Sequence, residues 1–231
     1  MRKSILTKTG NKVRIYVRVP GDKKEADYAI RARLTGECPC IFLGFGHEYG
    51  DGFISWDFEG RHTFKNQQDK PHEVLLDVSK NNIIDYIEPC VGHCDCELVD
   101  LSEAPDIISA YIKHCDDVKL NNPAMRRLDM YVMEASEIDL SSCVNLRELS
   151  IGCGYNVKEL DLTNCGHLEC LRISDRTCKA LTNIKLNEDS PLQYADVRGC
   201  KLNDDCISTI RRIIERNNGI YEDYVEKVWI V

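Results

Sequence analysis

Three consecutive stretches of this chain share one spacing of apolar residues. Apolar side chains stand at offsets 0, 2, 8, 11 and 13 from Ile138, Leu160 and Ile184. A period of about 22 residues with fixed apolar offsets predicts a stack of units, because no single unit can bury its own apolar side. The pairs at offsets 0/2 and 11/13 alternate with the period of a β-strand. Each unit is therefore expected to hold two short strands joined by turns.

The same spacing continues toward the N-terminus with decreasing regularity. The unit that begins at Val118 fits if one turn residue is missing, and the unit that begins at Val99 fits directly. The unit that begins at Leu76 fits weakly, since Pro89 stands where the last apolar residue is expected. The pattern thus predicts about six units within residues 71–203.

The repeat resembles the leucine-rich repeat, in the short form seen in internalin-like and gut-commensal bacterial proteins. The stretch from Leu146 to Ile151 reads Leu-x-x-Leu-x-Leu with an isoleucine last, and it alternates with Leu-Asp-Leu-Thr-Asn-Cys from Leu160 to Cys165. The resemblance implies a mainly β solenoid and says almost nothing about activity. It also implies that relatives of this type are often exported, and that the repeats end with a helix and a strand.

The segment before the repeats is expected to form a small β-domain, or cap, over residues 1–70. Four apolar residues alternate with polar ones as in a half-buried strand: Val13, Ile15, Val17 and Val19. Residues 28–34, 41–45 and 53–58 are further strand candidates, and the polar stretch from Glu59 to His72 is interpreted as a loose boundary. Such a domain would cover the open apolar end of the stack.

Residues 204–231 are expected to close the other end with a helix and a strand. Asn203 or an adjacent Asp can cap a helix with an acidic first turn, and residues 217–219 (Asn-Asn-Gly) stop it. One apolar face is formed by Ile207, Ile210, Ile213 and Ile214. Tyr224 to Val231 is the expected last strand. The predicted fold is mainly β with a C-terminal helix: a leucine-rich-repeat solenoid with an N-terminal β-domain.

Charge is unevenly distributed along the chain. Residues 1–34 hold ten Lys/Arg and three acidic residues, a net charge of +7, whereas the remainder holds 20 basic and 35 acidic residues, a net charge of −15. Phosphate is repelled by an acidic surface, so the repeats are not expected to bind nucleic acid. The basic segment could contact an acidic surface, but a solvated strand face explains it more simply.

Thirteen cysteines are a high and odd number. Several recur at repeat positions, as Cys143 and Cys165 do, which favours a structural role as small buried thiols. The densest group of potential ligands comprises Cys90, His93, Cys94 and Cys96. This group is compatible with zinc, with a disulfide or with plain thiols, and no second pair stands at zinc-finger spacing. No cofactor is predicted, and plain thiols are the favoured interpretation.

No enzyme motif is present in the sequence: there is no Gly-x-Ser-x-Gly, no phosphate loop and no His-Glu-x-x-His. Without such a motif, the candidate functional feature is the outward surface of the second strands. The residues between and after the apolar ones of the second strands should point outward, and they include the Tyr and Arg that are enriched in interfaces. The predicted partner-binding residues are Tyr111, Lys113, Asp129, Tyr131, Ser150, Arg172, Ser174, Asp196 and Arg198. An ordinary solvated sheet face is the alternative interpretation.

These observations predict a non-catalytic protein-binding module that is monomeric before it binds another protein. One version is a cytoplasmic neutraliser of a toxin or effector, and another is a trimmed cell-surface adhesion module. A metal- or redox-sensing protein that uses Cys90, Cys94 and Cys96 is the rival from a different class. The N-terminus has no apolar core of a signal peptide and no apolar run approaches the roughly 20 residues of a membrane helix. A cytoplasmic protein is expected, or an exported one whose leader is missing from this sequence, and no membrane partner is expected.

Overall fold

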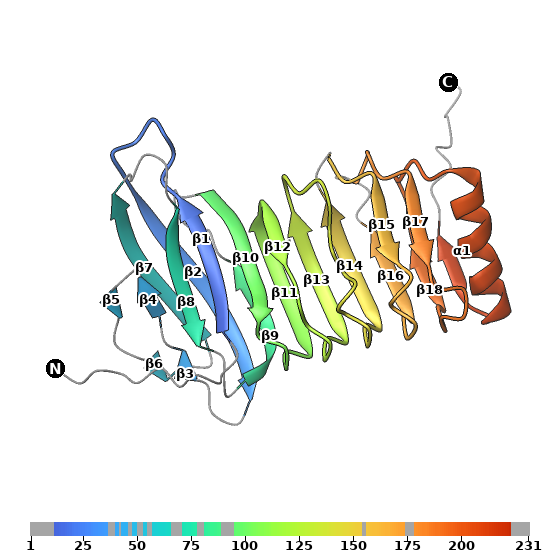
Figure 1. The fold of residues 1–231 in the computed structure, drawn as a ribbon, viewed down its shortest axis with the longest axis horizontal. Coiled ribbons are helices and arrows are strands. Elements are labelled where there is room, and N and C mark those ends of the chain that lie inside the picture. The colour runs from blue at the N-terminus through green and yellow to red at the C-terminus, as the bar shows by residue number, and fades with distance from the viewer. Residues whose placement is uncertain are drawn as a thin grey trace, which may run out of the picture.

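The computed structural model of the chain describes residues 12–36, 40–41, 43–45, 48–49, 53–54, 57–65, 71–77, 81–88, 95–153, 156–173 and 178–222. This part of the chain is mainly β-structure, with one α-helix near its C-terminal end. The strands form an elongated two-layered stack with α1 at one end (Figure 1). Both main sheets are open.

One layer is a nine-stranded sheet in which the second strand of each unit lies beside that of the next. In spatial order its strands are β19 (Ile220–Glu222), β18 (Tyr194–Asp196), β16 (Cys170–Ile173), β14 (Glu148–Cys153), β13 (Arg127–Val132), β11 (Ser109–Cys115), β9 (Asn81–Glu88), β2 (Glu25–Gly36) and β7 (Asp57–Lys65). From β19 to β9 all neighbours are parallel, whereas β2 is antiparallel to both β9 and β7.

The other layer begins with a six-stranded sheet. Its strands, in spatial order, are β12 (Asp117–Lys119), β10 (Asp95–Glu103), β1 (Lys12–Arg18), β8 (His72–Asp77), β4 (Leu43–Phe45) and β5 (Glu48–Tyr49). Two strand pairs complete the β-structure: β15 (Glu159–Leu162) with β17 (Asn183–Leu186), and β3 (Cys40–Ile41) with β6 (Phe53–Ile54). In Figure 1, β12, β15 and β17 lie in front of the parallel strands of the nine-stranded sheet.

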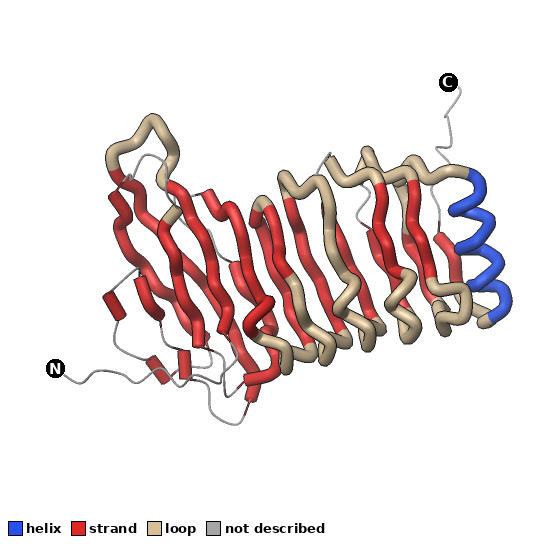
Figure 2. The backbone as a smooth tube through the Cα atoms, in the orientation of Figure 1, coloured by secondary structure: helices blue, strands red, loops and turns tan. Residues whose placement is uncertain are grey.

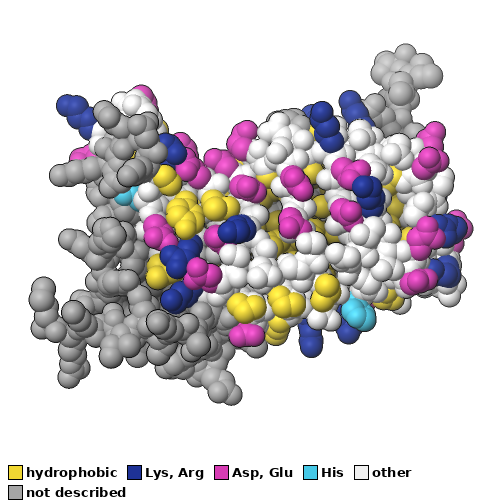
Figure 3. Space-filling view, viewed as in Figure 1, with side chains coloured by type: hydrophobic (Ala, Val, Ile, Leu, Met, Phe, Trp, Pro, Cys, Tyr) yellow, Lys and Arg dark blue, Asp and Glu magenta, His cyan; other side chains and the backbone are white. Residues whose placement is uncertain are grey.

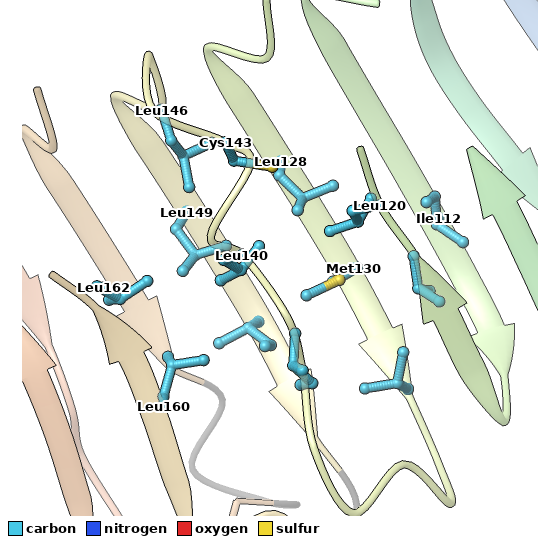
Figure 4. Close-up of a cluster of buried hydrophobic side chains, with 14 of the residues drawn as sticks. Ile112, Leu120, Leu128, Met130, Leu140, Cys143, Leu146, Leu149, Leu160 and Leu162 are labelled. Carbon is cyan, nitrogen blue, oxygen red and sulfur yellow. The ribbon is translucent and has the colours of Figure 1, made fainter. Parts of the chain in front are cut away.

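The core fills the space between the two layers. In the units from Val99 onward the predicted apolar offsets are buried, so that alternate side chains of each strand point inward. Figure 4 shows this packing, with Leu128 and Met130 of β13 and Leu149 of β14 facing Leu140 and Leu160 from the other layer. Because every unit contributes only a few of these side chains, burial depends on its neighbours on both sides.

One predicted first strand is absent. Ile138 and Leu140 are buried as expected, but the segment that contains them is a loop and not a strand. Figure 2 shows it in tan between β12 and β15. The apolar offset thus predicts burial correctly, while strand pairing also requires backbone hydrogen bonds to a neighbour, which the spacing of apolar residues does not specify.

The N-terminal segment differs from expectation at one boundary. The alternation over residues 13–19 is confirmed as β1, in which Val13, Ile15 and Val17 are fully buried. The stretch from Glu59 onward was expected to be a loose boundary, but β7 continues through Lys65 and pairs along its whole length with β2. The division at residue 70 stays a prediction. The strands before it belong to the same two sheets as the strands after it.

The C-terminal helix is confirmed. Its bounds are α1 (Asp204–Arg216), and the side chain of Asn203 accepts a hydrogen bond from the backbone N–H of Cys206 at 2.8 Å. Ile210, Ile213 and Ile214 are buried against the last unit. The strand predicted over residues 224–231 lies outside the described residues. No helix in the described part of the chain is both long and apolar enough to cross a membrane.

Asparagine side chains link successive units. Asn122 is fully buried, and its Nδ2 donates to the carbonyls of Leu101 at 3.2 Å and Ala104 at 2.6 Å in the preceding unit. Asn187 Nδ2 reaches the carbonyl of Thr163 in the same way, at 3.0 Å. The Leu101 and Ala104 carbonyls also accept backbone N–H groups of their own unit, from Ala104 at 2.9 Å and from Ile107 at 3.2 Å, so the Asn122 amide adds hydrogen bonds between adjacent units.

Candidate functional site

Five of the predicted partner-binding residues form one line across the nine-stranded sheet, here called the central row. Strand register aligns Tyr111 with Asp129, Asp129 with Ser150, Ser150 with Arg172, and Arg172 with Asp196. Their neighbours along each strand are buried, so the central row faces away from the core. Adjacent members stand about 4.8 Å apart, the spacing of paired strands.

The other predicted residues lie beside this row or outside the described region. Tyr131 is on the same face of β13, two residues after Asp129, and pairs with Gly152. Lys113 lies in β11, and Ser174 lies outside the described residues. Arg198 does not extend the row, because it follows β18 and folds back on the strand.

Arg198 is held by two carboxylates. Its Nε and Nη2 donate to the two oxygens of Asp196 at 2.8 and 2.6 Å, and Nη2 also lies 3.4 Å from Glu222 Oε2. The hydrogen bonds from the Arg198 side chain hold the pKa of Asp196 below its usual range. This arrangement neutralises the acidic end of the central row within the protein.

A second row precedes the central row and was missed by the sequence analysis. Register aligns Arg127, Glu148, Cys170, Tyr194 and Ile220. These residues stand one position before the first apolar residue of each second strand, a position that the sequence analysis did not count as outward-facing. The repeat spacing alone could have identified them.

The two rows contact each other where Arg172 of the central row meets Tyr194 of the second row. The Arg172 guanidinium lies over the ring of Tyr194, 5.0 Å from its centroid. Farther along the second row, Arg127 Nε is 3.7 Å from Glu148 Oε2. Burial raises the pKa of Cys170, so this thiol adds no negative charge to the face at neutral pH. The face therefore combines aromatic side chains with paired charges.

The opposite side of the stack carries an aspartate at the same position of several first segments. Asp100 Oδ1 accepts the backbone N–H of Ser102 at 2.8 Å, Asp139 that of Ser141 at 2.9 Å, and Asp161 that of Thr163 at 3.0 Å. Each of these bonds is local to its own unit, whereas the asparagine amides reach the preceding unit. The hydrogen bonds lower the pKa of Asp139 and of Asp161. Figure 3 shows acidic side chains spread over this face.

The basic N-terminal strand lies on this same side and is neutralised there. Arg14 forms ion pairs with Glu73 and Glu103, and Arg18 pairs with Glu97. These carboxylates come from β8 and β10, the two strands that flank β1. Two of the ten basic residues in the first 34, Arg14 and Arg18, are thus paired with carboxylates within the six-stranded sheet.

A shallow groove of about 430 Å³ lies on the acidic side, lined by residues 136–138 and by Asn156, Lys158, Glu159 and Asp161. Glu159 is already engaged, because its carboxylate accepts from Lys185 Nζ at 2.5 Å and from Asn183 Nδ2 at 2.9 Å. Asp161 is engaged as well, since its Oδ1 accepts from the backbone N–H and from the hydroxyl of Thr163.

Of the predicted cysteine cluster, the structure describes one member. Cys90, His93 and Cys94 lie outside the described residues, and Cys96 is buried in β10, with its Sγ 3.9 Å from the carbonyl of Leu98. Among the described residues no group of three or more His, Cys, Asp or Glu side chains could hold a metal ion.

The repeat cysteines occupy buried structural positions. None of the eight cysteines whose side chains the structure describes is in a disulfide. The Sγ atom of Cys165 lies 3.7 Å from the carbonyl of Cys143 in the preceding unit, and burial raises the pKa of Cys165 to about 12. Such a thiol is a poor nucleophile at neutral pH, because only the thiolate is reactive.

Comparison of the chain with protein-family models, with curated proteins and with solved structures found no match. The resemblance to leucine-rich repeats therefore rests on the spacing of this chain's own residues. The candidate site rests on strand register, on the direction of the side chains and on the charges around Arg172.

Proposed function

We propose that this chain is a non-catalytic protein-binding module, built as a leucine-rich-repeat solenoid, that binds its partner on the outward face of the nine-stranded sheet. The observation that carries the proposal is the central row, in which Tyr111, Asp129, Ser150, Arg172 and Asp196 stand in one register line on five successive parallel strands. Tyr131 and Tyr194 flank this row.

The backbone of this face favours binding, because it is already ordered. Strands β11, β13, β14, β16 and β18 are each hydrogen-bonded on both sides. A partner therefore orders little of the backbone when it binds, and association loses less conformational entropy than it would on a loop surface. Tyr and Arg add contact area and directed hydrogen bonds at the centre of such interfaces.

Charge narrows the class of partner. The chain has a net charge of −8, and the segment after residue 34 has a net charge of −15, so nucleic acid is disfavoured and another protein is favoured. A neutraliser of a toxin or effector, acting as a monomer until it meets its target, fits a rigid face of this kind. A cell-surface adhesion module would bind its partner through the same kind of rigid face.

Paired variants test the proposal. Affinity capture from the source cell with the intact protein, read by quantitative mass spectrometry, identifies proteins that are retained, and their affinities are then measured. Tyr131→Ala, on the proposed face, should weaken binding by about 1–3 kcal/mol with little loss of stability. Asp161→Ala, on the opposite face, should leave binding unchanged and lower the melting temperature slightly, since it removes the turn hydrogen bond to Thr163. The reverse pattern would show that the wrong face has been chosen.

A further inference from the structure

The layer opposite the proposed binding face is interrupted at one unit. Strands β10 and β12 pair with each other, and so do β15 and β17. Between β12 and β15 lie residues 138–140, here called the unpaired segment, which bury Ile138 and Leu140 in the core without forming a strand (Figure 2). Among the described residues, no backbone hydrogen bond joins the unpaired segment to β12 or to β15.

The edge of β15 that faces the unpaired segment carries backbone groups without a strand partner. Ile184 of β17 directs its N–H and carbonyl away from β15, to Cys206 Sγ at 3.3 and 3.5 Å. Backbone direction alternates along a strand, so in the parallel register the residue aligned with Ile184, Leu160, bonds to β17. The N–H and carbonyl groups of Glu159 and Asp161 therefore point toward the unpaired segment.

The groove of about 430 Å³ on the acidic side lies between the unpaired segment and β15. Of the residues that line it, three are acidic and one, Lys158, is basic. Two side-chain amides cross this gap at its ends: Asn156 Nδ2 donates to the Glu134 carbonyl at 3.2 Å, and Asn164 Nδ2 donates to the Ser141 carbonyl at 3.4 Å. Both hydrogen bonds are exposed to water, which can replace them when the gap widens.

Acidic side chains face each other across the gap. Glu137 and Asp139 of the unpaired segment stand at the same offsets as Glu159 and Asp161 of β15, and all four are exposed. On the other side of β15 a cation takes part instead, because Lys185 Nζ of β17 contacts Glu159 at 2.5 Å. Since like charges on neighbouring strands repel and opposite charges attract, β15 is held to β17 and kept apart from the unpaired segment.

The nine-stranded sheet, in contrast, continues from β13 through β14 to β16 without a break. A stack that is paired in one layer and interrupted in the other bends most easily about the paired layer. Packed layers lie about 10 Å apart, so each ångström of change at the gap corresponds to a rotation of about 6°. Widening the gap curves the proposed binding face toward a partner, and closing it bends this face outward.

From these observations we infer that the gap between the unpaired segment and β15 is a hinge. The first body, from β10 to β14, and the second body, from β15 to α1, rotate relative to each other about it. The strands of the nine-stranded sheet keep their partners during this motion, so the face stays ordered while its curvature changes. The inference goes beyond the proposed function, and it adds a means by which Tyr131 on one body and Arg172 on the other adjust to the shape of a partner.

The test measures the relative orientation of the two bodies in the intact protein by NMR, from residual dipolar couplings of the backbone amides in a weakly aligning medium. Glu137→Lys places a cation across the gap from Glu159 and Asp161, as Lys185 does on the other side of β15. This variant should close the gap and change the relative orientation by about 6° or more, the rotation for one ångström. Glu137→Gln removes one charge only and should have a smaller effect in the same direction.

Asp189→Lys is the matched control, since it makes the same charge change at an exposed residue in the turn after β17, away from the gap. It should leave the relative orientation unchanged. Couplings within each body should stay as in the wild type, which shows that every variant is folded. An orientation that does not change in Glu137→Lys, or that changes as much in Asp189→Lys, would overturn the hinge. Neither result bears on the proposed binding face, which Tyr131→Ala tests separately.

Discussion

Removing residues 204–231 should lower the free energy of unfolding of the remaining chain by about 5 kcal/mol or more and cause it to associate. Helix α1 buries Ile210, Ile213 and Ile214 against the last unit, and each fully buried isoleucine contributes about 1.5–3 kcal/mol. Without the helix these contacts are lost and the apolar end of the core meets water. Urea denaturation and size-exclusion chromatography of the truncated and intact proteins measure the two effects.

Point variants separate the loss of apolar contacts from the deletion itself. Ile213→Ala should cost about 2–5 kcal/mol, the range for a buried isoleucine that leaves a cavity. Ile220→Ala is its matched control, since Ile220 is 62% exposed, and it should change stability by less than about 0.5 kcal/mol. A monomeric truncated protein with unchanged melting would show that α1 is not needed to cover the stack.

Gly219→Ala should destabilise the protein by about 3 kcal/mol or more, because a Cβ at this position would lie 2.1 Å from the carbonyl oxygen of Gln193. The obstacle is backbone, so a side-chain rotation cannot relieve it. The N–H of Gly219 donates to the Ile214 carbonyl at 2.9 Å, and the N–H of Ile220 donates to that of Gln193 at 2.7 Å. Moving the chain away would therefore break the end of α1 and the start of β19. Chemical denaturation measures the difference.

The control for this substitution is Gly166→Ala. A Cβ at Gly166 would lie 3.5 Å from Asn187 Nδ2, an ordinary contact with a movable side chain, so its cost should stay below about 0.5 kcal/mol. Equal stability of the two variants would mean that the close approach between Gly219 and Gln193 does not exist in solution.

The repeat spacing predicted the buried positions and the central row, because both follow from local periodicity. The alternation of apolar and polar residues predicted that Val13, Ile15 and Val17 lie in the core. The capping residue, the acidic first turn and the spaced isoleucines predicted helix α1. The pairing of strands far apart in sequence could not be predicted this way. Nothing in the stretch from Glu59 to Lys65 indicates that it pairs with β2, since that strand is polar and its stability comes from a partner elsewhere in the chain.

The finer features of the candidate site also depend on contacts between units. The repeat spacing predicts that Arg172 and Arg198 both point outward as binding residues. In the structure Arg198 pairs with Asp196, whereas Arg172 stacks on Tyr194. Which arginine finds a carboxylate depends on strand register and on the turn after β18. Side-chain offsets identify the face, whereas they do not identify the charges that remain available on it.

Residue-level footprinting of the complex tests the binding face most directly. Hydroxyl radicals oxidise exposed tyrosines, and mass spectrometry reads the rate for each residue with and without the partner. We predict that oxidation of Tyr111, Tyr131 and Tyr194 falls by about threefold or more in the complex, because the centre of an interface is removed from water. Tyr16, on the outer face of the six-stranded sheet, should be unchanged. Protection of Tyr16 with unchanged oxidation of the other three tyrosines would contradict the account.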